Sequence, residues 1–225
     1  MKYIFCIFAK QKLFMLEFKG VVLEAGGQRA VSGLSFTVDA GEVVGLAGSS
    51  VRVRDSLLEA ALGLHAVNGG YVSFDGELMV PGAAQFFRRM VSYVPRDLRL
   101  PYATVAEMVE DLVALQANRA GNYTKDQLTA LWARIGMDPP IYEMPLHEVS
   151  GSVIRLVLLT TMRLIGKPYL MVAEPFSNDG HGLLPGLLHE AASGGAAVLV
   201  TGEAGELDGK CDRIIDIHSY ANNDT

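Results

Sequence analysis

The feature of the sequence that most restricts its fold is a pair of short runs that are apolar at every position. They are LMVA at 170–173 and AVLV at 197–200. A strand with one wet face alternates polar and apolar residues, so strands without polar positions need cover on both faces. Segments with helical periodicity lie between the β-rich segments. The chain is therefore predicted to be an α/β protein whose central strands are parallel.

The rest of the chain divides into segments by periodicity and by glycine-containing turns. Strands are predicted at 16–25, 30–39, 41–48, 71–80, 90–97, 169–173, 196–203 and 212–218. A helix is predicted around Leu57 to Leu64, another from Ser150 to Ile165, and the stretch from Thr104 to Ile135 reads as helical throughout. That stretch could be a helical insert.

Length and charge narrow the classes of function. The 225 residues fit one large domain or a core with a smaller insert, because domains average roughly 150 residues. With 19 basic and 25 acidic residues the net charge is −6, so no global positive field favours nucleic acid. Cys6 and Cys211 lie far apart without a CxxC, and no HExxH occurs, so neither a disulfide framework nor a metal centre is predicted.

The first residues, MKYIFCIFAKQKLFML, are apolar but are interrupted by Lys10 and Lys12. The run is shorter than the ~20 residues that a membrane span requires. Lys2 before YIFCIFA also fits a secretory signal, but no small-residue cleavage site follows. Residues 1–14 are therefore predicted to be an N-terminal extension or extra strand. An upstream start, with Met15 opening the domain, stays open, and 219–225 are read as a tail.

The segment GEVVGLAGSSVRVRDSLL at 41–58 has the strand–turn–helix order of a phosphate-binding loop, whose pattern is G-x-x-x-x-G-K-S/T. Gly48 matches the first glycine, Arg54 stands at the lysine, and Asp55 and Ser56 stand at the hydroxyl pair. This segment, with those described below, resembles the nucleotide-binding domain of ATP-binding cassette (ABC) transporters. The resemblance covers residues 15 to about 218.

The loop departs from the family pattern at its chemical positions. Val51 and Val53 replace the two inner glycines, and β-branched residues disfavour the positive φ values that turn N–H groups onto phosphate. The loop is therefore expected to be reshaped or collapsed. The planar fork of Arg54 does not replace a compact ammonium group. Asp55 would repel phosphate or cap the helix, or alternatively bind the metal.

Two further segments resemble family elements that contact the nucleotide. In MVSYVPRD, Arg96 stands at the glutamine that senses magnesium and the γ-phosphate; it is either an exposed loop arginine or enters the vacant site to pair with an acid. In HEVSGSVIRL, Ser150 and Gly151 match the signature that touches ATP bound to a partner subunit, whereas Ser152 and Val153 do not. Ser150 could equally be only a helix N-cap.

The last two segments resemble the family's Walker B strand and its switch. In PYLMVAEPFSND, Ala173 replaces the aspartate that positions magnesium, while Glu174 stands at the water-activating carboxylate. Gly202 stands at the switch histidine. A general base acts only when metal and phosphate hold the reacting atoms in reach, so Glu174 is expected to be idle.

The resemblance implies a P-loop NTPase (RecA-like) core with an antiparallel β region and an inserted α-helical subdomain at about 97–150. It implies ATP and Mg²⁺ as cofactors, bound weakly or not at all at this chain's own site. It also implies a place on the cytoplasmic face of a membrane, with a transmembrane permease and a second copy or an intact ATPase as partners.

The altered positions favour a structural or regulatory subunit. A slow but active ATPase using Arg54, Asp55 and Glu174 is the alternative, and an interaction module of ABC fold without a transport role is a further one. If the site is inert, Arg54 or Arg96 is predicted to form an ion pair with Glu174 or Asp55.

Overall fold

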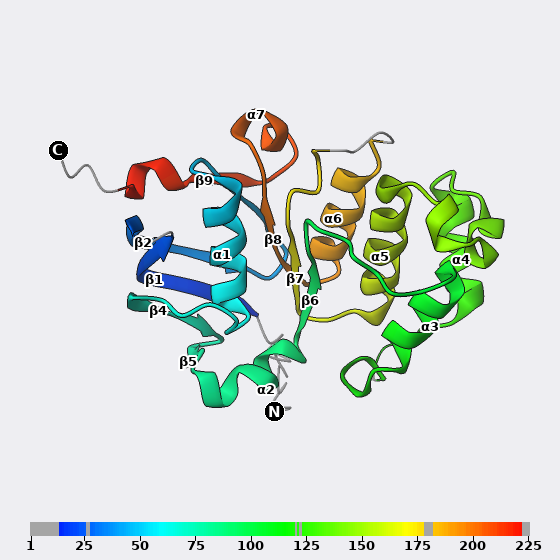
Figure 1. Cartoon of the computed structure of the whole chain (residues 1–225), viewed down its shortest axis with the longest axis horizontal. Helices are drawn as coiled ribbons and strands as arrows, with labels where there is room; N and C mark the ends of the chain where they lie inside the picture. The colour runs from blue at the N-terminus through cyan, green and yellow to red at the C-terminus, as the bar shows by residue number, and fades with distance from the viewer. Residues whose placement is uncertain (1–13, 26–27, 120, 122, 178–181, 222–225) are drawn as a thin grey trace, which may run out of the picture.

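The structure is a computed structural model that describes residues 14–25, 28–119, 121, 123–177 and 182–221. The predicted N-terminal extension, apart from Phe14, lies outside the described residues, as do Cys6 and the end of the predicted tail. The described chain forms two sheets with helices around them (Figure 1).

The central sheet has five parallel strands in the order β6-β7-β8-β3-β9. They are β3 (Val43–Ala47), β6 (Val91–Val94), β7 (Tyr169–Val172), β8 (Ala197–Thr201) and β9 (Arg213–Asp216). Every residue of β3, β7 and β8 is buried, which explains why these strands carry no polar alternation. The prediction of a parallel sheet covered on both faces is confirmed.

The second sheet is antiparallel, in the order β2-β1-β4-β5. It contains β1 (Met15–Ala25), β2 (Gln28–Asp39), β4 (Gly69–Phe74) and β5 (Glu77–Leu78). The single strand predicted at 71–80 is wrong in one respect, because the chain reverses at Asp75 and Gly76, which both have positive φ. The two halves pair with each other as a hairpin.

Helix α1 (Val51–Ala61) lies between the two sheets (Figure 1). Its leucines Leu57 and Leu58 are fully buried, in a core cluster that also contains Phe18 of β1 and Leu46 of β3. Because both flanks of α1 are packed, its N-terminal end is held firmly at the carboxyl end of β3. This is the position in which open α/β sheets place their ligands.

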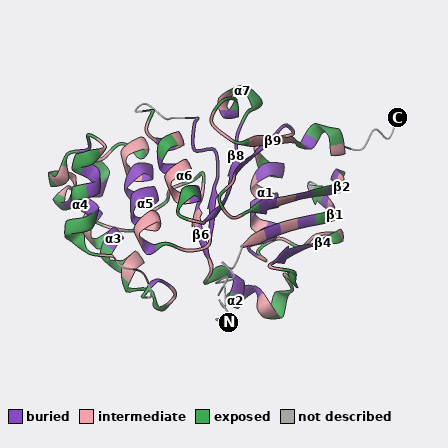
Figure 2. Ribbon diagram, turned by 180° about the vertical axis from the view of Figure 1, so that it is seen from behind, coloured by how far each residue is buried: buried purple, intermediate pink, exposed green. Residues whose placement is uncertain are grey.

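The other face of the parallel sheet is covered by α5 (Gly151–Ile165) and α6 (Leu184–Ser193). Helices α3 (Val105–Ala114) and α4 (Lys125–Arg134) pack against α5 on its far side (Figure 1). Figure 2 shows buried residues on the central strands and exposed residues on the outer sides of α3 and α4. Two short helices complete the fold. Helix α2 (Ala84–Arg88) lies next to β6, and α7 (Ala204–Leu207) lies next to β3 and β9. Among the described helices, none is long and apolar enough to span a bilayer.

The prediction of one helical stretch from Thr104 to Ile135 is wrong. Helix α3 ends at Ala114, a short 3-10 turn follows at Gln116–Asn118, and α4 begins at Lys125. Gly121, between them, lies so close to α5 that an added Cβ would be 2.8 Å from the carbonyl oxygen of Ile165. The predicted helix from Ser150 to Ile165 is confirmed, with Ser150 as its N-cap. The extent of a helical subdomain at about 97–150 stays a prediction.

Candidate functional site at the carboxyl end of the parallel sheet

The turn between β3 and α1 consists of Gly48, Ser49 and Ser50. Gly48 and Ser49 have positive φ, 81° and 59°, so these two residues make the turn. Helix α1 then begins at Val51, earlier than the sequence pattern indicated. Val51 and Val53, which stand at the predicted loop glycines, are therefore helical residues rather than loop residues.

The third and fourth backbone donors of α1 are already bonded within the helix end. The N–H of Val53 donates to the hydroxyl of Ser50 at 3.4 Å and to its carbonyl at 3.0 Å, and the N–H of Arg54 donates to the same carbonyl at 3.1 Å. Ser50 is thus the N-cap of the helix. The donors that a phosphate loop turns toward its ligand are satisfied by the protein itself at these positions.

The C-terminal segment of the chain covers the turn. The N–H of Ser49 donates to Nε2 of His218 at 3.1 Å. An added Cβ on Gly48 would be 2.4 Å from Oδ1 of Asp216 and 2.5 Å from Nδ1 of His218. Glycine at position 48 is therefore required both by its positive φ and by these neighbours. The contact with His218 was not predicted from the sequence.

We expect Gly48→Ala to destabilise the protein more than Gly33→Ala. Both glycines have positive φ, 81° and 75°, but only Gly48 has neighbours that a Cβ would meet. The left-handed backbone alone should cost about 1 kcal/mol at Gly33, and the contacts should raise the cost to about 2 kcal/mol at Gly48. Urea unfolding of the two variants measures the difference, and equal losses would contradict the role given to Asp216 and His218.

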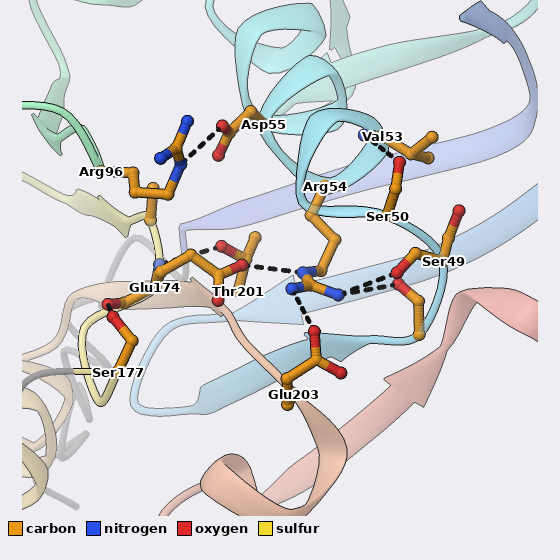
Figure 3. Close-up of polar contacts among 12 residues, drawn as sticks. Ser49, Ser50, Val53, Arg54, Asp55, Arg96, Glu174, Ser177, Thr201 and Glu203 are labelled. Atoms are coloured by element: carbon orange, nitrogen blue, oxygen red, sulfur yellow. Dashed lines mark hydrogen bonds and ion pairs between the residues drawn. The ribbon is translucent and has the colours of Figure 1, made fainter.

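Arg54 lies under this turn with its side chain fully buried, at 0% exposure (Figure 3). Its Nε donates to Oε1 of Glu174 at 2.8 Å, and its Nη2 to Oε1 of Glu203 at 2.7 Å. Its Nη1 donates to the carbonyl oxygens of Gly48 at 3.3 Å and Ser49 at 3.0 Å. Each of the three guanidinium nitrogens therefore has a partner, and the predicted ion pair of Arg54 with Glu174 is confirmed.

The two carboxylates around Arg54 differ in their surroundings. The Glu174 side chain is 6% exposed and that of Glu203 is 64% exposed. Burial alone would lower the pKa of Arg54, but the bonds to Glu174 and then Glu203 outweigh it and raise the pKa above its ordinary value. Glu174 adopts a positive φ of 48°, and its N–H donates to Oγ1 of Thr201 at 3.1 Å. Glu174 is thus fixed from both its backbone and its side chain.

Arg96 and Asp55 form a second ion pair beside the first. Nε of Arg96 lies 3.2 Å from Oδ2 of Asp55, with the Arg96 side chain 49% exposed (Figure 3). This matches the prediction that Arg96 pairs with an acid. Nearby, burial raises the pKa of Tyr93 to about 12, and the charges of Asp55 and Glu59 add to this effect.

A cavity of about 800 Å³ lies next to both ion pairs. Ser56 and Glu174 contribute to its wall. Its charged lining consists of four carboxylates and two guanidinium groups, from Glu24, Asp55, Glu59, Glu174, Arg52 and Arg96. Among the described residues that line it there is no Phe, Tyr or Trp, and the imidazole of His65 is the aromatic ring. The cavity is thus large enough for a nucleotide, but its charge balance is acidic.

The other predicted site residues lie around the same end of the sheet. Ala173 is fully buried after β7 and offers no carboxylate. Gly202 follows β8, and an added Cβ would lie 3.1 Å from Leu207, so the position is tightly packed. The residue after it, Glu203, supplies the carboxylate that reaches Arg54. Glu203 was not among the predicted site residues, and its place next to the switch position is the signal that points to it.

Ser150 and Gly151 lie at the start of α5, not in the large cavity. Both residues are exposed, and the hydroxyl of Ser150 accepts from the N–H of Val153 at 3.4 Å. The N-cap role of Ser150 is therefore confirmed, and its exposure leaves the partner-contact role open. Arg96 lines both the large cavity and a second one, of about 460 Å³, at this helix end.

The chain is similar in sequence to known ATP-binding proteins. Cell division ATP-binding protein FtsE of Haemophilus influenzae is 30% identical over 173 residues, which cover 73% of this chain and 77% of the relative. Fe(3+) ions import ATP-binding protein FbpC of Mesorhizobium japonicum is 28% identical over 200 residues, 85% of this chain but 54% of the relative. The chain thus spans about half the length of that relative.

A solved structure of a putative ABC transporter ATP-binding protein from Pyrococcus furiosus superposes with a TM-score of 0.76. It is 16% identical and covers 92% of this chain and 100% of its own. No protein-family model matches the chain. On its fold and on its relatives, the chain belongs to the ATP-binding proteins of ABC transporters. The predicted family and fold class are confirmed.

Proposed function

We propose that this chain is an ABC-type subunit that is impaired in ATP binding and hydrolysis at its own site. It acts as a structural or regulatory partner of an intact ATPase and a membrane permease, on the cytoplasmic face of the membrane. Residues 15–218 form its single nucleotide-binding-type domain. The observation that carries the proposal is the buried arginine Arg54, whose guanidinium is paired with Glu174 and Glu203.

The residues present do not fit a triphosphate with its magnesium ion. The N–H groups of Val53 and Arg54 are bonded to Ser50, so they cannot turn toward phosphate without unwinding the helix. Each lost charge-assisted hydrogen bond is worth roughly 1.5–3 kcal/mol, so the loss of several weakens binding by orders of magnitude. The acidic lining of the cavity adds repulsion.

Glu174 is also unsuited to act as a general base, because its carboxylate is already bonded to Arg54. Its Oε1 accepts from Arg54, and hydrolysis by this route would require the carboxylate to activate water beside a bound phosphate. Ala173 supplies no magnesium ligand. Within the described residues, no group of three or more His, Cys, Asp or Glu side chains could hold a metal ion.

In a mixed dimer, Ser150 and Gly151 would complete the ATP site of the partner. Both lie exposed at the N-terminus of α5, where partial positive charge favours phosphate oxygens. A homodimer would place the same surface over a site that binds ATP weakly or not at all. The mixed dimer therefore gives the signature a use that the homodimer does not.

The alternative is a slow ATPase that uses Arg54, Asp55 and Glu174 in unusual roles. The observation in its favour is that the carboxylate of Glu174 and the hydroxyl-bearing Ser56 both line the large cavity. In that case Arg54 would have to exchange its carboxylates for phosphate oxygens.

Calorimetric titration with Mg²⁺–ATP separates the two functions. We expect no saturable binding to the purified chain up to about 1 mM nucleotide, a level at which an intact loop is saturated. A relative with the complete G-x-x-x-x-G-K-S/T loop, assayed in parallel, is the positive control. Saturable binding, with hydrolysis that Glu174→Gln abolishes, would overturn the proposal in favour of the slow ATPase.

A further inference from the structure

A further cavity lies at the opposite end of the parallel sheet from the candidate site. It measures about 410 Å³, which is within the range of small-molecule sites. Lys167 and Pro168 precede β7 and Ala196 precedes β8, so the cavity lies at the amino ends of these strands. Much of its wall is apolar, with Phe14, Met162, Leu164, Pro168, Leu170 and Ala196 among the lining residues.

A buried hydroxyl group faces this cavity. Ser92 of β6 is 3% exposed, and its Oγ is a buried atom without a hydrogen-bond partner in the described part of the chain. The register partner of Ser92 on β7 is Leu170, so the two side chains share one face of the sheet, where both line the cavity. A buried hydroxyl costs free energy unless it forms a hydrogen bond. A ligand in the cavity would supply that bond.

The ammonium group of Lys167 lies at the same cavity without a carboxylate partner among the described residues. Its Nζ donates to the carbonyl oxygen of Val91 at 3.2 Å, which accounts for one of its three N–H groups. Burial lowers the pKa of Lys167, and no charge of a described carboxylate opposes this effect. The lining carboxylate, Glu190, is already paired, because its Oε2 lies 3.0 Å from Nη2 of Arg134 and 3.0 Å from Nη2 of Arg163. An anion in the cavity would therefore stabilise Lys167.

Arg163 adds a donor, and two helix ends limit the positive charge. Its Nε is buried and has no hydrogen-bond partner within the described ranges, while its Nη2 is held by Glu190. Helices α5 and α6 both end beside the cavity, where their last carbonyl groups carry partial negative charge. The cavity therefore favours a single negative charge over a doubly charged phosphate, whose hydration the apolar wall would also remove.

We propose that this cavity binds a small organic monocarboxylate with an apolar chain. The carboxylate accepts from Nζ of Lys167 and from the hydroxyl of Ser92. These two groups are neighbours, because Nζ of Lys167 is bonded to the carbonyl of Val91, the residue before Ser92. The apolar chain packs against Met162 and Leu170, which line the cavity. This proposal goes beyond the proposed function and does not rest on it, because the cavity lies at the other end of the strands.

The test is an NMR titration of the isotopically labelled full chain with sodium hexanoate, against hexanamide, which has the same shape without the charge. We expect saturable shifts of the amides of Ser92, Lys167 and Gly195 with hexanoate, and binding of hexanamide weaker by about tenfold or more. Sodium phosphate at equal ionic strength should bind more weakly than hexanoate. Tighter binding of phosphate at these amides, or hexanoate shifts no larger than those with sodium chloride, would overturn the proposal.

Variants test the roles of the two polar groups. Lys167→Gln should weaken hexanoate binding by about tenfold or more and leave hexanamide binding unchanged, because it removes only the charge. Lys167→Arg, the matched control, should keep most of the hexanoate affinity. Ser92→Ala should weaken hexanoate binding severalfold without lowering stability, since the hydroxyl has no described partner to lose. Equal hexanoate affinity of the Lys167→Gln and Lys167→Arg variants would contradict the proposal. These positions lie outside the candidate site, so the outcome is separate from that of the Mg²⁺–ATP titration.

Discussion

Replacement of Arg54 by methionine is expected to lower the free energy of unfolding by about 3–5 kcal/mol. The side chain of Glu174 is 6% exposed and has Arg54 as its ion-pair partner, so the variant leaves a carboxylate buried without a counter-charge. The carbonyl oxygens of Gly48 and Ser49 lose a donor at the same time. Urea unfolding followed by circular dichroism measures the loss.

The matched control is the double variant Arg54→Met with Glu174→Met. It removes the unpaired charge together with the arginine, so it should recover most of the stability that the single variant loses. Glu203→Gln should cost less than about 1 kcal/mol, because that carboxylate is 64% exposed. A single variant as stable as the double one would show that the buried ion pair does not hold the site closed.

The parallel sheet could be predicted because burial on both faces leaves a signal within a single strand, and two strands carry that signal. Strands buried on both faces must be apolar at every position, and 170–173 and 197–200 show this directly. The break between α3 and α4 could not be predicted in this way. Gly121, between the two helices, lies close to Ile165, a contact between residues that are distant in the chain and that only the fold brings together.

The residues of the candidate site also divide into those that the sequence predicted and those that it did not. The pairing of Arg54 with Glu174 followed from a simple requirement, since a buried charge needs an opposite charge. Glu203 was missed because it acts through a residue that only the fold brings near. Glu203 is 149 positions from Arg54 in sequence. No pattern of spacing identifies such a partner.

The early start of α1 explains how Val51 and Val53 affect the position of Arg54. Side chains of an α-helix point toward its N-terminus, so a helix that begins at Val51 directs Arg54 back under Gly48 and Ser49. Val53 is 4% exposed and adds apolar packing to this arrangement. The two valines thus hold the backbone in the conformation that lets Arg54 pair with Glu174.

Because the conformation of the turn depends on Val51 and Val53, glycine at these two positions should produce the second large effect that we expect. A variant with Val51→Gly, Val53→Gly, Arg54→Lys and Asp55→Ser restores the G-x-x-x-x-G-K-S pattern after Gly48. Glycine regains positive φ, so the N–H groups now bonded to Ser50 can turn toward phosphate. If two or more charge-assisted hydrogen bonds return, affinity for Mg²⁺–ATP should rise by about 100-fold or more. Calorimetric titration measures this gain.

The gain should come with a loss of stability, which identifies its cause. Two glycines in the helix should lower the free energy of unfolding by about 2 kcal/mol, apart from the loss of valine packing. The control carries Val51→Ala and Val53→Ala with the same changes at Arg54 and Asp55. Because alanine keeps the helix, this control should bind nucleotide no better than the natural chain. Equal affinity of the glycine and alanine variants would show that side-chain charge, and not the backbone of the turn, excludes the triphosphate.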